Sequence, residues 1–369
     1  MKKLLALALA LVMLCSCIVV ATAETAAVKI GISMPTQSLE RWNRDGSYLD
    51  EQFKAAGYET ILTYSDNDAS RQVNDIQNML SDGVSMLIIS AIDGEALNTV
   101  MDEAAEAGVK VIAYDRLIKN DAVSYYVSFD NYTVGKLQGQ YVETALDLAN
   151  AGDKTYNIEF TAGDPADNNA GYFFNGAFDV LKSYIEAGAL KVVSGQTEFS
   201  AVATAQWSTD TALNRASNIL ASYYADGTQL DAWLCSNDST AMGVAQAIGT
   251  DYAGSNSIIV TGQDGDIANL ANIVDGKQTM TVYKNVANEA VVTLALANAM
   301  IAGEVDGNAL KDTFGIPCAF DTESYQTSDG HNCPSFLLVP SVITKDNLQD
   351  LVATGLYVMG DDGYLKAAE

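Results

Sequence analysis

Short apolar runs alternate with longer amphipathic segments along most of the chain from residue 28. The runs at 29–33, 60–64, 86–90 and 109–114 read as strands, because they are short and rich in β-branched residues. Between them, apolar residues recur every three or four positions at 46–56, 70–81 and 95–107, which predicts helices, and glycines follow as stops. Strands that alternate with helices form βαβ units and a parallel sheet. The pattern therefore predicts an α/β fold.

The same rhythm restarts after a run at 126–129, which indicates a second unit of the same kind. We expect helices at 133–148, 170–187, 209–224, 239–249, 267–275 and 287–302, and strands at 156–160, 191–194, 232–235, 257–261 and 280–283. The chain has 369 residues, enough for two domains with full cores. We find no low-complexity linker between the series, so the two lobes should be joined by short hinge strands. The predicted fold is two similar, doubly wound parallel-sheet lobes.

Composition excludes several classes of function. The net charge of −27 argues against a nucleic-acid partner, which would require Lys and Arg, and suits a neutral ligand. The single histidine, His331, lies in a polar loop, and no metal-ligand spacing or nucleophile motif is present. We expect no metal and no cofactor.

The N-terminal segment 1–23 resembles a signal peptide, with Lys2 and Lys3 before an apolar run at 4–14. Two cleavage sites compete. Leu14-Cys15-Ser16-Cys17 resembles a lipobox, which would leave a lipidated Cys17, whereas Ala21-Thr22-Ala23 fits ordinary signal peptidase. We favour the lipoprotein. No later run is long enough to span a bilayer, so the chain should be exported and reach the membrane only through a lipid anchor.

Three cysteines lie beyond this leader, namely Cys235, Cys318 and Cys333. Cys318 and Cys333 flank a polar loop, and the oxidising compartment favours a disulfide between them. Spacing alone does not establish connectivity. Cys235 would then be an unpaired, buried thiol.

Polar side chains follow the predicted strands where they end, which in an open parallel sheet is the edge of the ligand crevice. Asp115 and Arg116 end one strand, and similar groups end five others: Arg41 and Trp42; Asp164, Asp167, Asn168 and Asn169; Asn237 and Asp238; Gln263 and Asp264; and Lys284. Planar polar groups bind hydroxyls, and an aromatic face covers the C–H side of a sugar ring. Each group has a structural alternative. Asp115 and Arg116 would form a strand-end ion pair, Asp164, Asp238 and Asp264 would cap helices, and Trp42 and Trp207 would be core residues.

The ordered set of motifs resembles the bacterial xylose-binding receptors and the multiple-monosaccharide receptors of ABC importers, which have the type I periplasmic-binding-protein fold. The motifs are 39–42 (LERW), 113–116 (AYDR), 167–170 (DNNA), 236–238 (SND), 262–264 (GQD) and 279–284 (TMTVYK). The resemblance runs from about Val28 to the C-terminus. It implies two α/β lobes, 28–132 with 287–339 and 133–286 with 340–369, which are joined by three hinge strands and close on one sugar.

The resemblance also implies a set of binding residues. The hydrogen-bonding side chains would be Arg41, Asp115, Arg116, Asp167, Asn169, Asn237, Asp264 and Lys284. Trp42 and Trp207 would cover the ring faces, although the segment 199–208 around Trp207 departs from the related receptors. Residues 35–39 and 171–174 are candidates for the wall beside the sugar's C5 position.

The implied function is capture of a monosaccharide for an ABC permease by a monomeric receptor. D-xylose is the first candidate, and glucose, galactose and arabinose are the others. An alternative is a sugar receptor that feeds a chemoreceptor or a sensor kinase, since its ligand chemistry would be the same. A remote alternative is a secreted glycosidase with Glu159 paired with Asp264 or Asp167. The acidic composition and the leader argue against a sugar-responsive transcription regulator.

Overall fold

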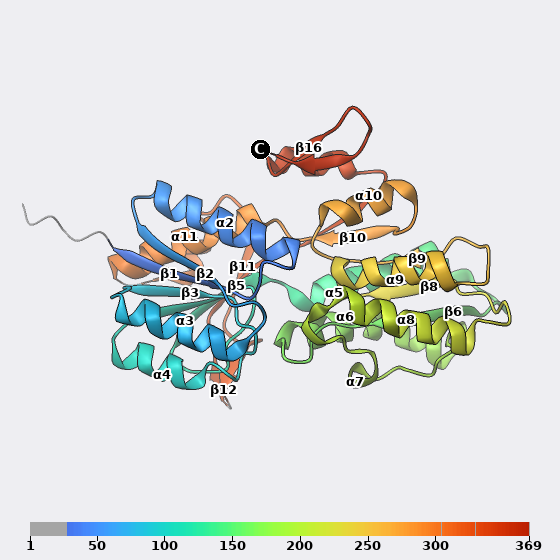
Figure 1. Cartoon of the computed structure of the whole chain (residues 1–369), viewed down its shortest axis with the longest axis horizontal. Coiled ribbons are helices and arrows are strands. Elements are labelled where there is room, and N and C mark those ends of the chain that lie inside the picture. The colour runs from blue at the N-terminus through green and yellow to red at the C-terminus, as the bar shows by residue number, and fades with distance from the viewer. Residues whose placement is uncertain (1–27, 304, 329, 369) are drawn as a thin grey trace, which may run out of the picture.

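The computed structural model describes residues 28–303, 305–328 and 330–368, which form two α/β lobes side by side (Figure 1). The predicted signal peptide and Cys17 lie outside the described residues. The predicted fold class is confirmed: each lobe contains a mostly parallel sheet with helices on both faces. None of the helices within the described ranges is both long enough and apolar enough to cross a membrane.

The first lobe is built on a seven-stranded sheet of order β11-β14-β5-β4-β3-β1-β2. Its strands are β1 (Lys29–Met34), β2 (Glu59–Tyr64), β3 (Met86–Ile89), β4 (Lys110–Tyr114), β5 (Val123–Phe129), β11 (Cys318–Asp321) and β14 (Ser335–Leu338). All neighbours are parallel except the edge strand β11, which is antiparallel to β14. The interior strand β3 is buried throughout, as expected for a parallel strand covered on both faces.

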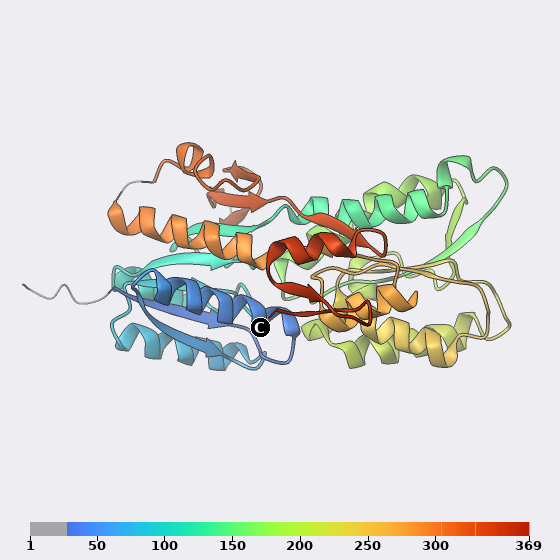
Figure 2. The ribbon, with the colours of Figure 1, turned by 90° about the horizontal axis from the view of Figure 1, so that it is seen from above.

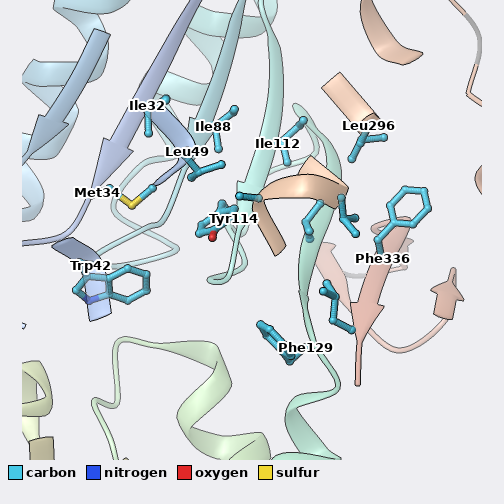
Figure 3. Close-up of a cluster of buried hydrophobic side chains, with 14 of the residues drawn as sticks. Ile32, Met34, Trp42, Leu49, Ile88, Ile112, Tyr114, Phe129, Leu296 and Phe336 are labelled. Atoms are coloured by element: carbon cyan, nitrogen blue, oxygen red, sulfur yellow. The ribbon is translucent and has the colours of Figure 1, made fainter. Parts of the chain in front are cut away.

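Helices cover both faces of this sheet. They are α2 (Glu40–Ala55), α3 (Ala69–Ser81), α4 (Asn98–Glu106), α11 (Val286–Ala302) and α12 (Gly307–Lys311). Leu49 of α2 and Leu296 of α11 pack over Ile32, Ile88 and Ile112 on one face (Figure 3). The helices α3 and α4 cover the other face. Trp42 belongs to the first of these clusters and lies at its end beside the second lobe (Figure 3).

The second lobe has a four-stranded parallel sheet of order β7-β6-β8-β9. Its strands are β6 (Tyr156–Thr161), β7 (Leu190–Val192), β8 (Ala232–Cys235) and β9 (Ile259–Val260), and the pair β10 (Met280–Tyr283) and β15 (Ser341–Thr344) continues beside β9. The helices are α5 (Asn131–Ala145), α6 (Asn168–Glu186), α7 (Phe199–Val202), α8 (Thr209–Tyr223), α9 (Asp238–Asp251) and α10 (Ile267–Asp275). The helices α5 and α6 pack on one face and α8 and α9 on the other.

Short elements complete the chain. They are the hairpins β12 (Gln326–Ser328) with β13 (His331–Asn332) and β16 (Tyr357–Met359) with β17 (Leu365–Ala367), and the 3-10 turns at 148–150, 205–207 and 348–354. Figures 1 and 2 show the C-terminal segment, in red, beside α10 and close to the junction of the lobes. Tyr357 of this segment packs with Leu270 of α10 in a shared apolar cluster.

The chain crosses between the lobes three times, as predicted. The first crossing is at Asp130, whose carboxylate caps α5, and the second is at Lys284–Asn285, where Asn285 caps α11. The third is at Val339–Pro340, between β14 of the first lobe and β15 of the second. Because helix caps fix the backbone at two crossings, the hinge segments are short and well defined.

Helix α2 begins six residues before its predicted start. It was expected at Gly46, but it begins at Glu40, so Arg41 and Trp42 lie in its first turn and not in a loop. The preceding Leu39 makes no side-chain cap, and a glycine in the helix interior resembles a break. Because of these two features, the sequence did not indicate where the helix begins.

The predicted disulfide between Cys318 and Cys333 is wrong. Among the described residues Cys235, Cys318 and Cys333 are all free thiols. In the antiparallel register, Cys318 lies opposite Leu338, five residues beyond Cys333 along the chain. That separation is roughly 16 Å along a strand, far beyond the ~7 Å between Cα atoms that a disulfide tolerates.

We predict that Gly135→Ala destabilises the protein by about 1–3 kcal/mol. An added Cβ at Gly135 of α5 would lie 1.9 Å from the carbonyl oxygen of Phe173 in α6, so the two helices would have to separate. Gly249→Ala in α9 is the matched control, since an added Cβ there has no atom within 4 Å. The control should gain up to about 1 kcal/mol from helix propensity. Urea unfolding measures both variants, and equal midpoints would contradict the prediction.

Candidate functional site

A cavity lies between the lobes at the carboxyl ends of their strands, with about 350 Å3 of space not filled by atoms, including the part open to solvent. Nine of the ten predicted binding residues line it: Arg41, Trp42, Asp115, Arg116, Asp167, Trp207, Asn237, Asp264 and Lys284. They come from both lobes and are all buried. The cavity therefore lies at the strand ends, where the sequence predicted it.

Arg41 is the centre of the polar network in this cavity. Its guanidinium donates from Nε to Asp45 at 2.8 Å, from one terminal nitrogen to Asp264 at 3.0 Å, and from the other to Asp115 at 2.8 Å and to Glu289 at 3.1 Å. Asp264 belongs to the second lobe and the other three acids to the first. One fully buried guanidinium thus ties the two lobes together.

Lys284 bridges two of these four acids, Asp115 and Asp264, and its ammonium nitrogen lies 3.3 Å from each. Burial alone would raise the pKa of Asp115, but the charges of Arg41, Lys284 and Arg116 hold it well below its usual value. The pKa of Asp264 is also lowered, because Lys284 and Arg41 outweigh its burial. Both carboxylates are therefore ionised at neutral pH and act only as acceptors.

A second ion pair closes another side of the cavity. Arg116 Nε lies 3.1 Å from Asp167 Oδ2, and the Trp207 indole N–H donates to the same oxygen at 3.2 Å. The other oxygen of Asp167 accepts from the backbone N–H of Asn169 and caps α6. The Arg116 guanidinium also lies 4.9 Å from the centre of the Trp42 ring. Asp167 therefore serves as helix cap and cavity residue at once.

The lining is balanced in charge and partly aromatic. Three cations, Arg41, Arg116 and Lys284, stand with three carboxylates, Asp115, Asp167 and Asp264. Rings of Trp42, Trp207 and Phe173 lie among them, and Phe173 and Trp207 pack edge to face with centroids 6.2 Å apart. A balanced set of donors and acceptors with aromatic faces suits a neutral ligand rich in hydroxyl groups.

Three of the lining residues have unusual backbone conformations. Asp115, Trp207 and Asp264 have positive φ angles of 57°, 54° and 106°, which side chains other than glycine rarely adopt. Asp115 is held there because its carbonyl oxygen accepts hydrogen bonds from Tyr126, Ser128 and Asn169. Such strained residues concentrate at functional sites, where the surrounding structure stabilises them.

Asn169 is the predicted residue that does not line the cavity. Its amide donates to the Asp115 carbonyl oxygen at 2.6 Å, and its oxygen accepts from Tyr126 and Asn131. It holds Asp115 in position from the other lobe. Asn237 does line the cavity, but its side-chain oxygen caps α9 by accepting from the Thr240 N–H.

Four lining residues were absent from the predicted binding set: Leu39, Phe173, Ser239 and Gln263. Leu39 and Phe173 fall within the segments expected to form a wall beside the ligand. Gln263 was noticed at a strand end, next to Asp264. Ser239 carried no signal, because a serine in the first turn of a helix is common for structural reasons.

For four of the candidate residues the structure shows whether the side chain has a structural role. Asp164 accepts from the backbone N–H groups of Ala166 and Gln206 in a turn, and Asp238 from those of Gly265 and Asp266. Trp42 and Trp207 are core residues as well as lining residues, so both interpretations hold.

The structure argues against the glycosidase alternative, because Glu159 is not at the cavity. Glu159 is absent from the cavity lining, and its carboxylate accepts from Ser194 and Tyr224 inside the second lobe. Within the described ranges, no cluster of three or more potential metal ligands is found.

A second set of contacts between the lobes lies just outside the cavity. Arg44 of α2 donates to the carbonyl oxygens of Asp264 and Gly265, both at 3.0 Å, and to the Asp266 carboxylate at 3.2 Å. Glu40, one turn earlier on α2, accepts from the N–H of Ile267 at the start of α10. We call the contacts of Glu40 and Arg44 with residues 264–267 the latch. The latch joins the first lobe to the second.

The chain is similar in sequence to a known family and to several known proteins. Residues 30–305 match the family model described as a periplasmic binding protein domain. The chain is 39% identical to the multiple sugar-binding periplasmic receptor ChvE of Rhizobium radiobacter, over 90% of this chain and 91% of that one. It is 33% identical to the D-xylose-binding periplasmic protein of Escherichia coli, over 94% of each chain.

A solved structure is also similar to this chain. An ABC transporter solute-binding protein from Clostridium phytofermentans, determined with bound β-D-glucose, superposes with a TM-score of 0.84. It is 46% identical, and the match covers 91% of this chain and 99% of that one.

We predict that Arg44→Met lowers the closed fraction of the ligand-free protein, because hydrogen bonds to charged groups are worth about 1.5–3 kcal/mol each. Lys54→Met is the matched control on the same helix, since among the described residues Lys54 pairs only with Asp50 of its own lobe. Small-angle X-ray scattering should give a larger radius of gyration for Arg44→Met and an unchanged one for the control. Identical scattering by both variants would show that the latch does not hold the lobes closed.

Proposed function

The chain belongs to the periplasmic binding protein family, and on this premise we propose that it is an extracytoplasmic receptor that captures a monosaccharide and delivers it to an ABC transporter. It is a binding protein and not an enzyme, like the relatives that it matches. The observation that carries the proposal is the cavity between the lobes, where three buried cations, three buried carboxylates and aromatic rings converge.

The proposed ligand is D-xylose or another aldopyranose such as glucose, galactose or arabinose. Arg41, Arg116 and Lys284 donate to ring hydroxyls, and Asp115 and Asp264 accept from them. Trp42 and Trp207 cover the apolar faces of the ring. Leu39 and Phe173, which line the cavity within the segments 35–39 and 171–174, form the wall that decides whether a hydroxymethyl group at C5 fits.

The binding mechanism follows from the division of the site between the lobes. Arg41, Asp115 and Arg116 come from the first lobe, and Asp264 comes from the second. A sugar that contacts both sets binds the closed form more tightly than the open form, so it shifts the population toward closure. Closure also excludes water, which strengthens the charge-assisted hydrogen bonds to the sugar. The closed shape is the one that the permease recognises.

Several further features belong to this proposal. The lobes comprise 28–132 with 287–339 and 133–286 with 340–369, and the receptor acts as a monomer. A lipid on Cys17 anchors it to the outer face of the cell membrane. The alternative of a receptor that signals to a chemoreceptor or a sensor kinase uses the same site and differs only at the outer surface.

Isothermal titration calorimetry with D-xylose, D-glucose, D-galactose, L-arabinose and D-ribose tests the function. We expect one-to-one binding of at least one aldopyranose. Tight binding of D-xylose alone indicates a dedicated pentose receptor, and comparable binding of several sugars indicates a multiple-sugar receptor. If a folded protein binds none of the five, the proposed ligand class is wrong.

The latch makes sugar affinity dependent on pH through Asp266. Burial, opposed by Arg44 and reinforced by Asp264 and Glu40, raises the pKa of Asp266 in the closed form to about 7. Opening exposes this carboxyl to water and returns its pKa toward the usual ~4. The closed form therefore binds the proton more tightly. Closure is favoured below pH ~4 and loses this stabilisation as the pH rises to about 7.

We predict that sugar affinity falls severalfold between pH 5 and pH 7.5, by at most about tenfold per pH unit. Calorimetry across this range measures the effect. Asp266→Asn is the control, because an amide keeps an acceptor for Arg44 and does not titrate. Its affinity should be nearly independent of pH, and an unchanged slope in Asp266→Asn would assign the effect to another group.

A further inference from the structure

Gln263 is buried in the lining of the cavity with its side-chain amide uncommitted. It is 2% exposed, and its Oε1 is buried without a hydrogen-bond partner. No hydrogen bond from its Nε2 is found either, among the residues that the structure describes. A buried amide without partners is rare in a stable protein, because losing its hydrogen bonds to water is unfavourable.

The other amides near the cavity are already in use. Asn169 makes three hydrogen bonds that join it to Asp115, Tyr126 and Asn131. The oxygen of Asn237 caps α9, which leaves only its N–H2 group for a ligand. Gln263 is therefore the amide of this site with both a donor and an acceptor available.

Contacts of its own backbone fix the position of Gln263 at the cavity. Its carbonyl oxygen accepts from the Asp238 N–H at 2.8 Å, and the residue pairs with Val282 of β10 as an extension of the sheet. The neighbouring Asp264 N–H donates to the Val282 carbonyl oxygen at 2.9 Å. A position fixed by α9 on one side and by β10 on the other is preorganised for binding.

The surroundings of Gln263 differ from the rest of the lining. Ser239 and Asn237, at the start of α9, line the same side of the cavity, and both are neutral. The charged residues each offer one kind of hydrogen bond, since Arg and Lys only donate and ionised Asp only accepts. A hydroxyl group donates one hydrogen bond and accepts others, so a single amide satisfies both capacities.

We propose that Gln263 is a specificity-determining ligand that binds one particular hydroxyl group of the monosaccharide through both ends of its amide. This inference rests on the proposed function. It assigns to Gln263 the direct contact that the sequence had led us to expect of Asn169, and it gives Asn169 the task of holding Asp115. A sugar without that hydroxyl leaves the amide unpaired and binds more weakly.

The test compares Gln263→Met with Gln72→Met. Methionine has nearly the length of glutamine and lacks its hydrogen-bonding groups. Gln72 is also a buried amide, but it is fully bonded inside the first lobe, to Ser33, Ser90 and Ile92. Each variant and the native protein are titrated calorimetrically with D-glucose, D-xylose and the monodeoxy analogues of both. Thermal unfolding of the ligand-free proteins is measured in parallel.

We expect Gln263→Met to lose about tenfold or more in affinity for the parent sugar and nothing for one monodeoxy analogue, the one that lacks the contacted hydroxyl. Its ligand-free melting temperature should be equal to or above that of the native protein, because an unpaired amide is removed. Gln72→Met should melt at a lower temperature and keep the native order of preference among the sugars.

Two results would overturn the inference while leaving the proposed function intact. One is unchanged affinity of Gln263→Met for every sugar. The other is a uniform loss across all analogues together with a lower melting temperature, which would give Gln263 a structural role. If the native protein binds no sugar, the proposed function fails and this inference fails with it.

Discussion

The closed arrangement depends on one guanidinium in contact with four carboxylates. Arg41 has five N–H groups and donates four hydrogen bonds, to Asp45, Asp115, Asp264 and Glu289, and every one of these groups is buried. Burial of like charges this close together is unfavourable unless cations or protons compensate them. Lys284 supplies a second cation, and burial together with Asp115 raises the pKa of Glu289 well above its usual value, which favours the neutral form of this acid. Without Arg41 the remaining acids would repel one another across the junction of the lobes.

Helix α2 is the element that carries closure. Glu40, Arg41 and Arg44 lie within its first two turns and reach the second lobe, Arg41 inside the cavity and the other two at the latch. Residues three and four positions apart share one face of a helix, so a single helix end presents both sets of contacts. A sugar that closes the lobes therefore also forms the latch. On the proposed mechanism the latch in turn raises the apparent affinity, because it increases the closed population that binds the sugar.

The sequence predicted the cavity better than it predicted the tasks of individual residues. Asp115, Asp264 and Lys284 were placed correctly because parallel strands all end at one edge of a sheet, whatever the exact register. Asn169 and Gln263 show the limit of this argument. Whether an amide is available to a ligand depends on partners distant in sequence, such as Tyr126 and Asn131 for Asn169.

The position of Cys318 relative to Cys333 and the start of helix α2 were also predicted wrongly, and each error has a physical cause. Pairing of Cys318 with Leu338 is set by packing of β11 on β14, which no local pattern near the cysteines reveals. The start of α2 has no capping side chain at Leu39, so the usual sequence signal is absent. Local rules predict an element where a local interaction forms it, and they fail where tertiary contacts decide.

The backbone conformation at Trp207 is determined by tertiary contacts. It lies in a short turn where both Gln206 and Trp207 have positive φ, and not in a regular helix or strand. The turn is held because Asp164 accepts from the Gln206 N–H and the Thr204 N–H donates to the Gly163 carbonyl oxygen.

The ring of Trp207 then lies directly against Gly163, where an added Cβ would be 1.9 Å from a ring carbon. A glycine at that strand end is thus a requirement of the aromatic wall. Because the turn is strained and its supports come from residues 163 and 164, its conformation follows from the second lobe as a whole. The segment 199–208 therefore presents an aromatic ring to the cavity although it forms no long regular element.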